Sequence, residues 1–176
     1  VILYPLLYVL GASFSSGQAI ASGRFWLWPV DATLAGYEAI FKNRMVLVGF
    51  YNSLFYTLVG TLINVVMTIL AAYPLSRPEL PGRRIIAFAF FFTLLFSGGL
   101  IPTYLVVRDL DMLSTRWAMI LPTALSVWNV FIARTFFENT IPKELREAAE
   151  LDGCDDFNFL GRIVLPLSGS LLAVLA

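Results

Sequence analysis

The residues best placed to do chemistry lie in one charged segment, Ile141 to Leu167, near the end of an otherwise apolar chain. Glu147 is followed directly by Ala148 and Ala149, and Gly153 follows four residues later. A carboxylate beside two small side chains offers a charged contact and lets a partner approach closely. The residue types in this segment therefore predict binding to another protein.

Bond-making chemistry has little support elsewhere in the sequence. The chain has no histidine, which excludes a Ser-His-Asp triad and an H-E-x-x-H metal site. Neither lysine, Lys42 or Lys143, follows a glycine, so a Walker A loop is excluded. Cys154 is the single cysteine. With a net charge of zero, nucleic-acid binding has no electrostatic support. We expect no catalytic residue, no metal and no cofactor on this chain.

The composition places the charged segment in a membrane protein. Of the 176 residues 59% are hydrophobic and 14% are charged, and the mean hydropathy is +0.79. About a quarter of residues are charged in soluble domains, so this chain has too little polar surface to cover a water-soluble fold.

Three long stretches carry no charge: 46–76, 85–107 and 117–133. Each is near or above the length that a helix needs to cross a hydrocarbon core of roughly 30 Å. With partial apolar runs at 1–14 and 157–176, we predict an all-α, polytopic transmembrane helix bundle with five spans, the first and fifth incomplete. The alternative is the buried core of a soluble protein, which three such runs in so short a chain disfavour.

The two ends of the sequence lie inside apolar runs. Val1 opens one run and Ala176 closes another, so we expect a chain truncated at both ends, and a single transmembrane domain over 1–176. The first run also fits a signal-peptide core ahead of Ala19-Ile20-Ala21, but no basic region precedes it.

Basic residues in the connecting segments predict the orientation. Two groups flank the spans on one side: Arg77, Arg83 and Arg84, then Lys143, Arg146 and Arg162. By the positive-inside rule both groups are cytoplasmic. The opposite segment, 15–45, also carries Arg24, Lys42 and Arg44, so the bias is modest. That segment holds aromatic residues suited to the membrane interface, Trp26, Trp28 and Tyr37, and 31–43 predicts a surface helix with Thr33 as its cap.

Glycine and proline interrupt the spans at Gly98–Pro102, Pro122 and Pro166. Proline removes a backbone hydrogen bond and kinks a helix. Such a break is either a packing kink or a helix break beside a translocation path, and the sequence leaves both open.

Within 141–167 the pattern predicts two short helices joined by a turn. Pro142 and Glu144 suit the first turn of a helix. Leu145, Ala148 and Ala149 are spaced to share one face. Gly153 fits a C-terminal cap, and Asp155 or Asp156 fits the cap of the next helix. From these residues alone, an amphipathic helix lying on the lipid headgroups is the favoured interpretation.

The spacing of these residues resembles a known family motif. Glu147-Ala148-Ala149, three residues, Gly153, nine residues, then Ile163-x-Leu165-Pro166 is similar to the EAA loop of binding-protein-dependent ABC-importer permeases. Asp152 also resembles the common form of the loop. Further segments resemble the maltose-type carbohydrate permeases, in their lipoprotein- and polysaccharide-importer-like branch: 52–54, 71–77 and 98–104. Family members usually have six spans.

The resemblance implies a role for each matching position. The ATPase-coupling residues would be Glu147, Ala148, Ala149, Asp152, Gly153, Ile163, Leu165 and Pro166, within a cytoplasmic loop over 141–167. The partners would be a second permease subunit, a cytoplasmic ABC ATPase dimer that binds ATP and Mg, and an extracytoplasmic solute-binding protein. The chain would be a non-catalytic, multi-pass protein of the bacterial inner or plasma membrane, in contact with lipid and a sugar.

Sugar contacts are predicted from residue type and from position in a span. Asn129, Trp128, Tyr104 and Thr93 offer an amide, two aromatic faces and a hydroxyl. Asn129 is the best candidate because a buried amide needs a partner. Trp128 and Tyr104 also suit lipid contact or helix packing.

We therefore predict a permease subunit of an ATP-driven importer for a sugar or oligosaccharide. An ABC permease for a non-sugar solute is the alternative. An ion-driven secondary carrier is a weaker one, because the three full spans carry no ionisable residue. A membrane scaffold or sensor would show no coupling to ATP hydrolysis.

Overall fold

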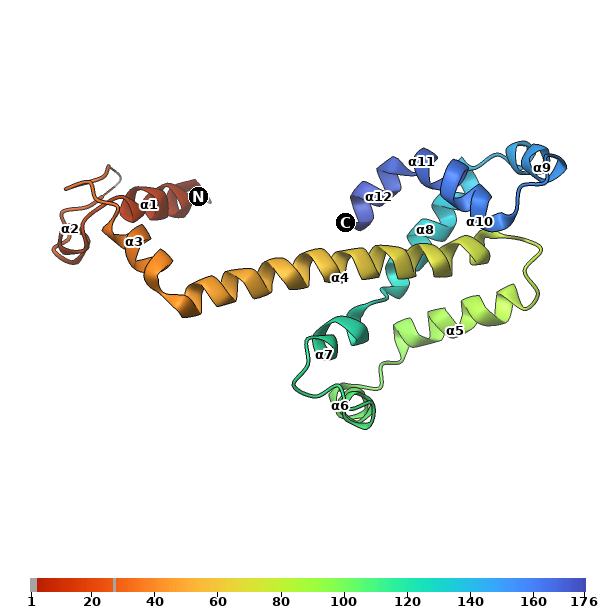
Figure 1. The fold of residues 1–176 in the computed structure, drawn as a ribbon, viewed down its shortest axis with the longest axis horizontal. Helices are drawn as coiled ribbons and strands as arrows, with labels where there is room; N and C mark the ends of the chain where they lie inside the picture. The colour runs from red at the N-terminus through yellow and green to blue at the C-terminus, as the bar shows by residue number, and fades with distance from the viewer. Residues whose placement is uncertain (1–2, 27) are drawn as a thin grey trace. The chain divides into compact units, whose positions relative to one another are not determined.

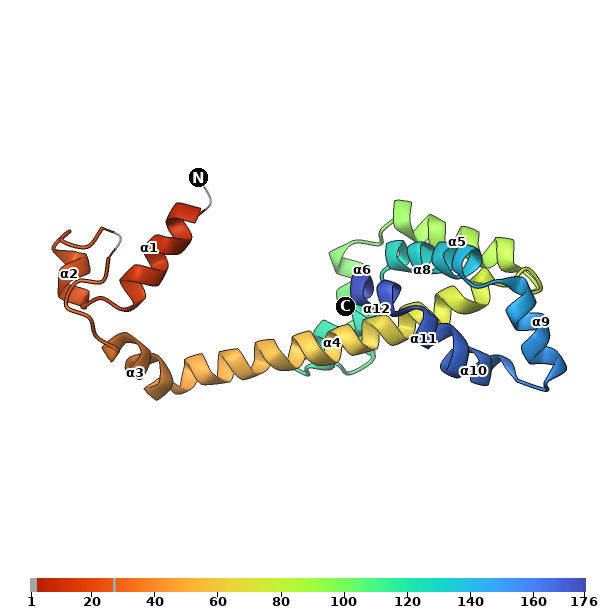
Figure 2. The same cartoon turned by 90° about the horizontal axis from the view of Figure 1, so that it is seen from above.

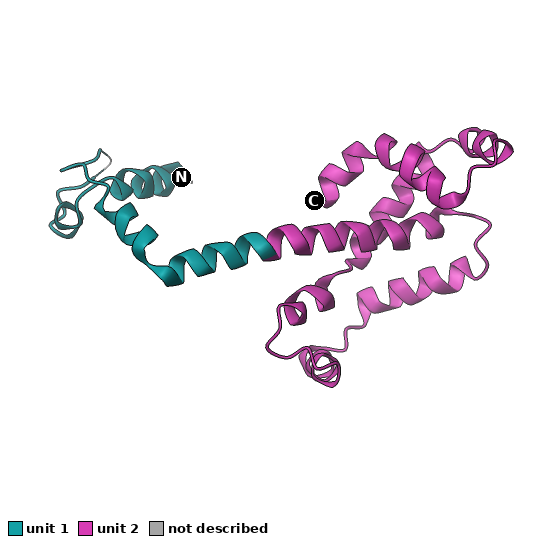
Figure 3. Cartoon of the chain, viewed as in Figure 1, with its two compact units in different colours: residues 1–55 teal, residues 56–176 magenta. Residues whose placement is uncertain are grey.

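The computed structural model describes residues 3–26 and 28–176, so Val1 and Ile2 of the first apolar run, and Leu27, lie outside the described residues. The described part is helical and contains no strand, which confirms the predicted all-α class (Figure 1). Contacts divide the chain into two compact units, residues 1–55 and 56–176 (Figure 3). The boundary falls inside the long helix α4, and the single domain predicted over 1–176 stays a prediction.

The first unit contains three short helices, α1 (Leu3–Ser13), α2 (Gly17–Ala21) and α3 (Ala35–Lys42). The Ser15 hydroxyl accepts a hydrogen bond from the Val30 backbone at 3.2 Å, and the Tyr37 hydroxyl donates to Ser13 at 2.8 Å. The surface helix predicted over 31–43 is present as α3. Thr33 lies one residue before the cap position, where its hydroxyl accepts from the Ala35 N–H at 3.1 Å.

Helix α4 (Arg44–Ser76) is the longest element and begins where Asn43 accepts a hydrogen bond from the Met45 N–H. Among the described residues it is the one helix long and apolar enough to cross a bilayer by itself. Three bent helix pairs would bring the number of candidate spans to four, and α1 is a shorter apolar helix. Pro74 lies in the last turn of α4, and Pro78 follows its end, where it cannot extend the helix.

The core of the second unit forms where three parts of the chain meet. The end of α4 supplies Ile69, Ala72 and Leu75; α8 (Val127–Thr140) supplies Val130, Ala133 and Phe137; the C-terminal segment supplies Phe159, Val164 and Leu171. Helix α5 (Arg83–Leu95) adds partly buried Ala87 and Phe90. The view in Figure 2 shows α5 beside α8 and the C-terminal helices beside α4.

The stretch 85–107 is not the straight span expected from its apolar run. Helix α5 ends at Leu95, α6 (Leu100–Asp109) begins after Gly99, and the two helices are bent by 117°. Gly99 has φ +83° and ψ −175°, a conformation that is essentially restricted to glycine. The predicted break at Gly98–Pro102 is confirmed in place, and its size is a finding of the structure.

The stretch 117–133 is also bent, by 49°, between α7 (Trp117–Ile120) with the 3₁₀ turn η1 (Leu121–Thr123) and helix α8. Pro122 lies in the 3₁₀ turn, as its missing N–H predicts. The Asn64 side chain of α4 donates to the Thr123 carbonyl at 3.3 Å. A polar side chain of one helix therefore satisfies a backbone group at the break in another.

The C-terminal stretch contains α10 (Asp156–Phe159), a π-helical segment η2 (Leu160–Val164), α11 (Leu165–Leu167) and α12 (Gly169–Leu175). The bend of 82° falls at Ser168, whose buried hydroxyl donates to the Val164 carbonyl at 2.7 Å. Pro166 was expected to bend this span. The bend lies two residues further on. It follows the π-helical segment, which departs from regular α-helical hydrogen bonding, and the Ser168 hydroxyl bonds a backbone carbonyl there.

Candidate functional site

The charged segment folds as two helices joined by a glycine turn. Helix α9 (Lys143–Leu151) begins after Pro142 and is capped at its end by Asp152. Gly153 has φ +75°; its N–H donates to the Glu150 carbonyl at 3.0 Å, and the Cys154 N–H donates to the Ala149 carbonyl at 2.9 Å. This pair of bonds is a Schellman motif, which places glycine in the left-handed conformation. The predicted role of Gly153 as a helix C-terminal cap is confirmed.

The second helix of the segment begins with a carboxylate cap. Asp155 is extended, and its side chain accepts from the Asn158 N–H at 2.9 Å. Of the two aspartates offered by the sequence, Asp155 therefore caps α10. Asp156 is left free to reach the neighbouring segment.

The apolar face predicted for α9 is partly buried and partly exposed. Ala149 is 8% exposed and packs in the core of the second unit, whereas Ala148 and Leu145 are exposed. Glu147 is also exposed, and no ion pair of its carboxylate is present among the described residues. Ala148 and Glu147 are thus open to a partner, while Ala149 holds α9 onto the chain itself. Leu145, Ala148 and Ala149 thus share one face of α9 as predicted, but of the three only Ala149 is buried by the chain itself.

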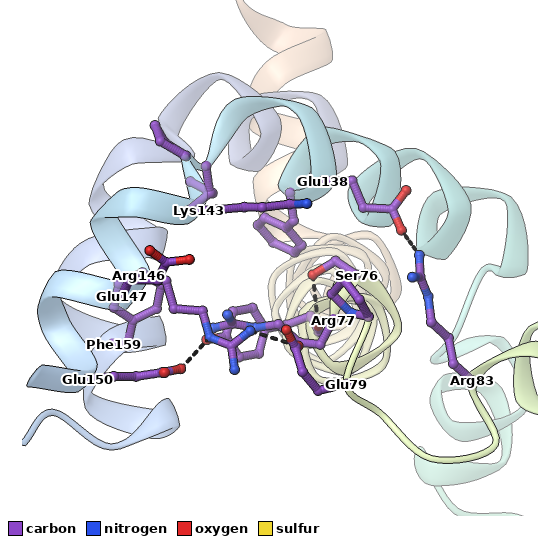
Figure 4. A pocket seen from close by; sticks show the side chains of 15 residues that line it. Ser76, Arg77, Glu79, Arg83, Glu138, Lys143, Arg146, Glu147, Glu150 and Phe159 are labelled. Carbon is purple, nitrogen blue, oxygen red and sulfur yellow. Dashed lines mark hydrogen bonds and ion pairs between the residues drawn. The ribbon is translucent and has the colours of Figure 1, made fainter.

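Arg146 connects α9 to the turn that follows α4. Its guanidinium lies 2.7 Å from a carboxylate oxygen of Glu79 and 2.6 Å from one of Glu150 (Figure 4). Hydrogen bonding to Glu79 raises the pKa of Arg146, and the same bond lowers the pKa of Glu79. Both groups are therefore charged at neutral pH.

Arg77 connects the end of α4 to α10. Its guanidinium lies over the Tyr73 ring at 4.5 Å and the Phe159 ring at 5.3 Å from the centroids, and it donates to the Tyr73 hydroxyl. Asp156 lies 3.4 Å away. Burial lowers the pKa of Arg77, which Asp156 partly offsets, and an arginine still remains protonated at neutral pH. The residue thus combines stacking with an ion pair.

A third arginine joins α5 to α8. Arg83 forms an ion pair with Glu138, which also accepts from Arg134 at 3.0 Å. Arg83 further donates to the Leu75 carbonyl at 2.8 Å. Three of the six basic residues used to predict orientation, Arg77, Arg83 and Arg146, therefore have specific partners. Sequence reasoning missed these roles, because each pair joins positions far apart in the chain.

A cleft of about 670 Å³ lies between these elements. Arg77, Arg146 and Arg83 line it together with Glu79, Glu138 and Glu147 (Figure 4). Because positive and negative side chains are balanced and mostly paired, the cleft does not select an anion or a cation. Among the described residues no group of three histidine, cysteine or acidic side chains is placed to hold a metal.

The four predicted sugar contacts lie outside this cleft. Asn129 is half-buried on α8, next to Trp128, whose side chain is 63% exposed. Tyr104 is 51% exposed on α6, and the Thr93 hydroxyl donates to the Phe90 carbonyl of its own helix at 2.8 Å. The four residues come from three helices: Thr93 lies on α5, Tyr104 on α6, and Trp128 and Asn129 on α8. Their role in sugar binding stays a prediction.

The remaining motif residues lie after the turn. Ile163 is part of the π-helical segment, Leu165 begins α11, and both pack partly buried against the core of the second unit. Pro166 is exposed. Asp152 is exposed at the end of α9. Ile163 and Leu165 thus hold the loop onto the helix bundle, whereas Glu147, at the cleft, and Ala148 are exposed.

The Arg146–Glu79 pair predicts a defined response to acid. Because the pKa of Glu79 is lowered in the folded chain, the pair contributes stability fully above the ordinary Glu79 pKa of 4.5 and loses it as the pH falls through the lowered value. We expect the unfolding temperature of the protein in detergent to fall as the pH is lowered below 4.5. The fall is expected to be smaller in Glu79→Gln, which lacks the titrating carboxylate. Identical acid profiles for parent and variant would contradict the assignment.

Known proteins are similar to this chain in sequence. The chain is 41% identical over 172 residues to the polygalacturonan/rhamnogalacturonan transport system permease protein YtcP of Bacillus subtilis, covering 98% of this chain and 60% of that protein. It is 39% identical to protein LplC of the same organism, over 99% of this chain and 59% of that protein. No family model matches.

A solved structure is also similar to this chain in its fold. The crystal structure of a bacterial ABC transporter involved in the import of the acidic polysaccharide alginate contains a chain that matches with a TM-score of 0.93 and 34% identity. The match covers 99% of this chain and 62% of that one. The present chain thus spans about three fifths of the length of these relatives.

The helical fold and these matches indicate a membrane-embedded protein. More narrowly, nearly the whole chain is similar to permease proteins of ABC transport systems, and the matched relatives include a permease of polygalacturonan/rhamnogalacturonan transport.

Proposed function

We propose that the protein to which this chain belongs is the permease subunit of an ATP-driven importer of a sugar or oligosaccharide. The observation that carries the proposal is the loop α9–Gly153–α10, which presents Glu147 and Ala148 outward from a buried base. The names of the relatives, which refer to polygalacturonan, rhamnogalacturonan and alginate, support the carbohydrate substrate.

In this proposal the loop faces the cytoplasm and docks in a groove of a partner ATPase dimer, which binds ATP and Mg. Glu147 would pair with a basic residue of that groove, and Ala148 would allow close approach. Closure of the ATPase dimer would then move the helices by rigid-body rotation and change the side to which the substrate path opens. The basic residues around the loop support a cytoplasmic location in a bacterial plasma membrane.

A second permease subunit and an extracytoplasmic solute-binding protein complete the proposed assembly. The exposed side of α4 supports a need for further partners, because Leu58 and Leu62 are more than half exposed in the chain alone. Lipid and a neighbouring permease would both cover such side chains. This chain itself would hold no cofactor.

The sugar path is tested at Asn129. A hydrogen bond from its amide to a sugar hydroxyl is worth about 0.5–1.5 kcal/mol, so Asn129→Ala is expected to raise the KM for uptake roughly two- to tenfold. Thr135→Ala is a matched control on the same helix, since the Thr135 hydroxyl bonds to the Phe131 carbonyl of its own helix. Uptake kinetics are measured in liposomes with assembly checked by copurification. Unchanged kinetics in Asn129→Ala would remove this residue from the path.

The function as a whole is tested by sugar-stimulated ATP hydrolysis. The full-length chain is reconstituted in liposomes with candidate permease, ATPase and binding-protein partners, beside Glu147→Ala and Gly153→Asp. Stimulation that is lost in both variants would support an ABC importer coupled through this loop. ATP hydrolysis that is the same with and without the chain and in both variants, together with uptake driven by an ion gradient, would instead favour a secondary carrier.

A further inference from the structure

We propose that Arg146 and Arg77 are positioning residues that fix the two helices of the loop to the end of α4, so that a movement of the loop moves α4 with it. Arg146 holds α9, and Arg77 holds α10. This inference rests on the proposed function, because it assumes that an ATPase acts on α9. It adds the path by which that action reaches the membrane helices.

The first contact is the Arg146–Glu79 pair. Arg146 lies in the middle of α9, and Glu79 lies in the turn that leads from α4 to α5, 67 residues earlier. Glu150, one turn along the same helix, holds the guanidinium from the other side at 2.6 Å. Since Glu150 and Arg146 share a helix, Glu79 is the partner that links α9 to the end of α4.

The second contact is made by Arg77. It follows directly after α4 and reaches Asp156 and Phe159 in α10, while Tyr73 lies on its other side. The planar guanidinium is held by stacking and by charge at once, which fixes its orientation more closely than either contact alone. Its side chain is 15% exposed.

The two contacts leave from one short segment, 73–79: the Glu79 contact reaches α9 before the Gly153 turn, and the Arg77 contact reaches α10 after it. Apolar packing also holds the loop, through Ala149, Cys154 and Phe159. Apolar contact is non-directional, so it resists separation but permits sliding. Charge-assisted hydrogen bonds are directional, and two of them on either side of a turn define its angle. The arginines therefore add orientation to a loop that the core already retains.

Arg146→Glu and Glu79→Arg are each expected to place like charges together and to loosen α9. The full-length permease, assembled with its partners in liposomes, is measured for sugar taken up per ATP hydrolysed. Coupling between sites typically amounts to about 5–150-fold, so each single variant is expected to lower this ratio about fivefold or more while assembly persists. The double variant, in which the pair is restored with reversed charges, is expected to recover part of the ratio, because Glu150 still repels a carboxylate at position 146.

A general loss of stability would not give this pattern. Arg84→Glu is the matched control, because Arg84 is an exposed neighbour of Arg83 outside the loop contacts, and its ratio is expected to stay at the parent value. Arg77→Lys keeps the charge and loses the planar stacking, so it is expected to lower the ratio as well. Should Arg146→Glu fail to assemble, Arg146→Gln removes the charge while a hydrogen bond to Glu79 remains possible, and it is expected to lower the ratio less.

The outcomes separate this inference from the proposed function. If the parent is coupled and Gly153→Asp is not, but the Arg146, Glu79 and Arg77 variants keep the parent ratio, the positioning role is overturned and the importer stands. A double variant that stays as low as the single ones would also overturn it. If hydrolysis never depends on the chain, the proposed function fails and this inference fails with it.

Discussion

Replacing Gly153 with aspartate is expected to reduce coupled transport to background while the full-length protein still inserts in the membrane. Two effects act together. The left-handed conformation at φ +75° is unfavourable for a residue with a Cβ. The new carboxylate also joins Asp152, Asp155 and Asp156 at the negative end of the α9 dipole. Transport into liposomes and the yield of inserted protein are the two measurements.

Gly153→Asn is the control for this change. Asparagine has nearly the size of aspartate, tolerates the left-handed conformation better than most residues, and adds no charge. We expect it to retain much of the transport. The space around Gly153 is open, because no described residue other than its chain neighbours has a heavy atom within 4 Å of the position that a Cβ would take, so neither variant meets a clash inside the chain. Wild-type transport in Gly153→Asp would refute the role of this turn.

The second large effect is expected from changing Ala148 and Ala149 to leucine, one at a time. Ala149 is buried in the core, so Ala149→Leu overpacks it and is expected to destabilise the chain by about 1–3 kcal/mol. Ala148 is exposed, so Ala148→Leu is expected to leave stability within about 0.5 kcal/mol and to lower transport strongly by blocking the ATPase groove.

The pair of variants is compared by two measurements, unfolding in detergent and sugar-stimulated ATP hydrolysis. Each alanine serves as the control for the other, because the substitution is identical and the positions are adjacent. Equal effects of the two changes on stability would contradict the difference in burial between Ala148 and Ala149. Normal hydrolysis in Ala148→Leu would show that the partner does not approach this side of α9.

Local features of the loop were predictable from the sequence. The bonds that cap α9 and α10 join residues three to five positions apart, from Ala149 to Asn158, so the residue types and their spacing specify them. The same holds for the places where the spans break. Gly99 and Pro122 interrupt the helix through their own backbone chemistry, whatever surrounds them.

Several features needed the tertiary structure. The bends are 117° at Gly99 and 82° at Ser168, and residue types along the sequence do not specify these angles. The burial of Ala149 and the exposure of Ala148 follow from the position of the core formed by α4, α8 and the C-terminal segment. Helical spacing placed both alanines on one face and could not say where that face ends.

The sequence by itself determined the membrane class, the breaks at Gly99 and Pro122, and the loop with its glycine turn, because apolar runs and capping bonds act over a few neighbouring residues. Only the tertiary structure decided which arginine meets which carboxylate. Arg146 and Glu79 are 67 positions apart, and Arg77 and Asp156 are 79 positions apart. Such pairs depend on how the chain folds back on itself, and charge signs along the sequence allow many other pairings.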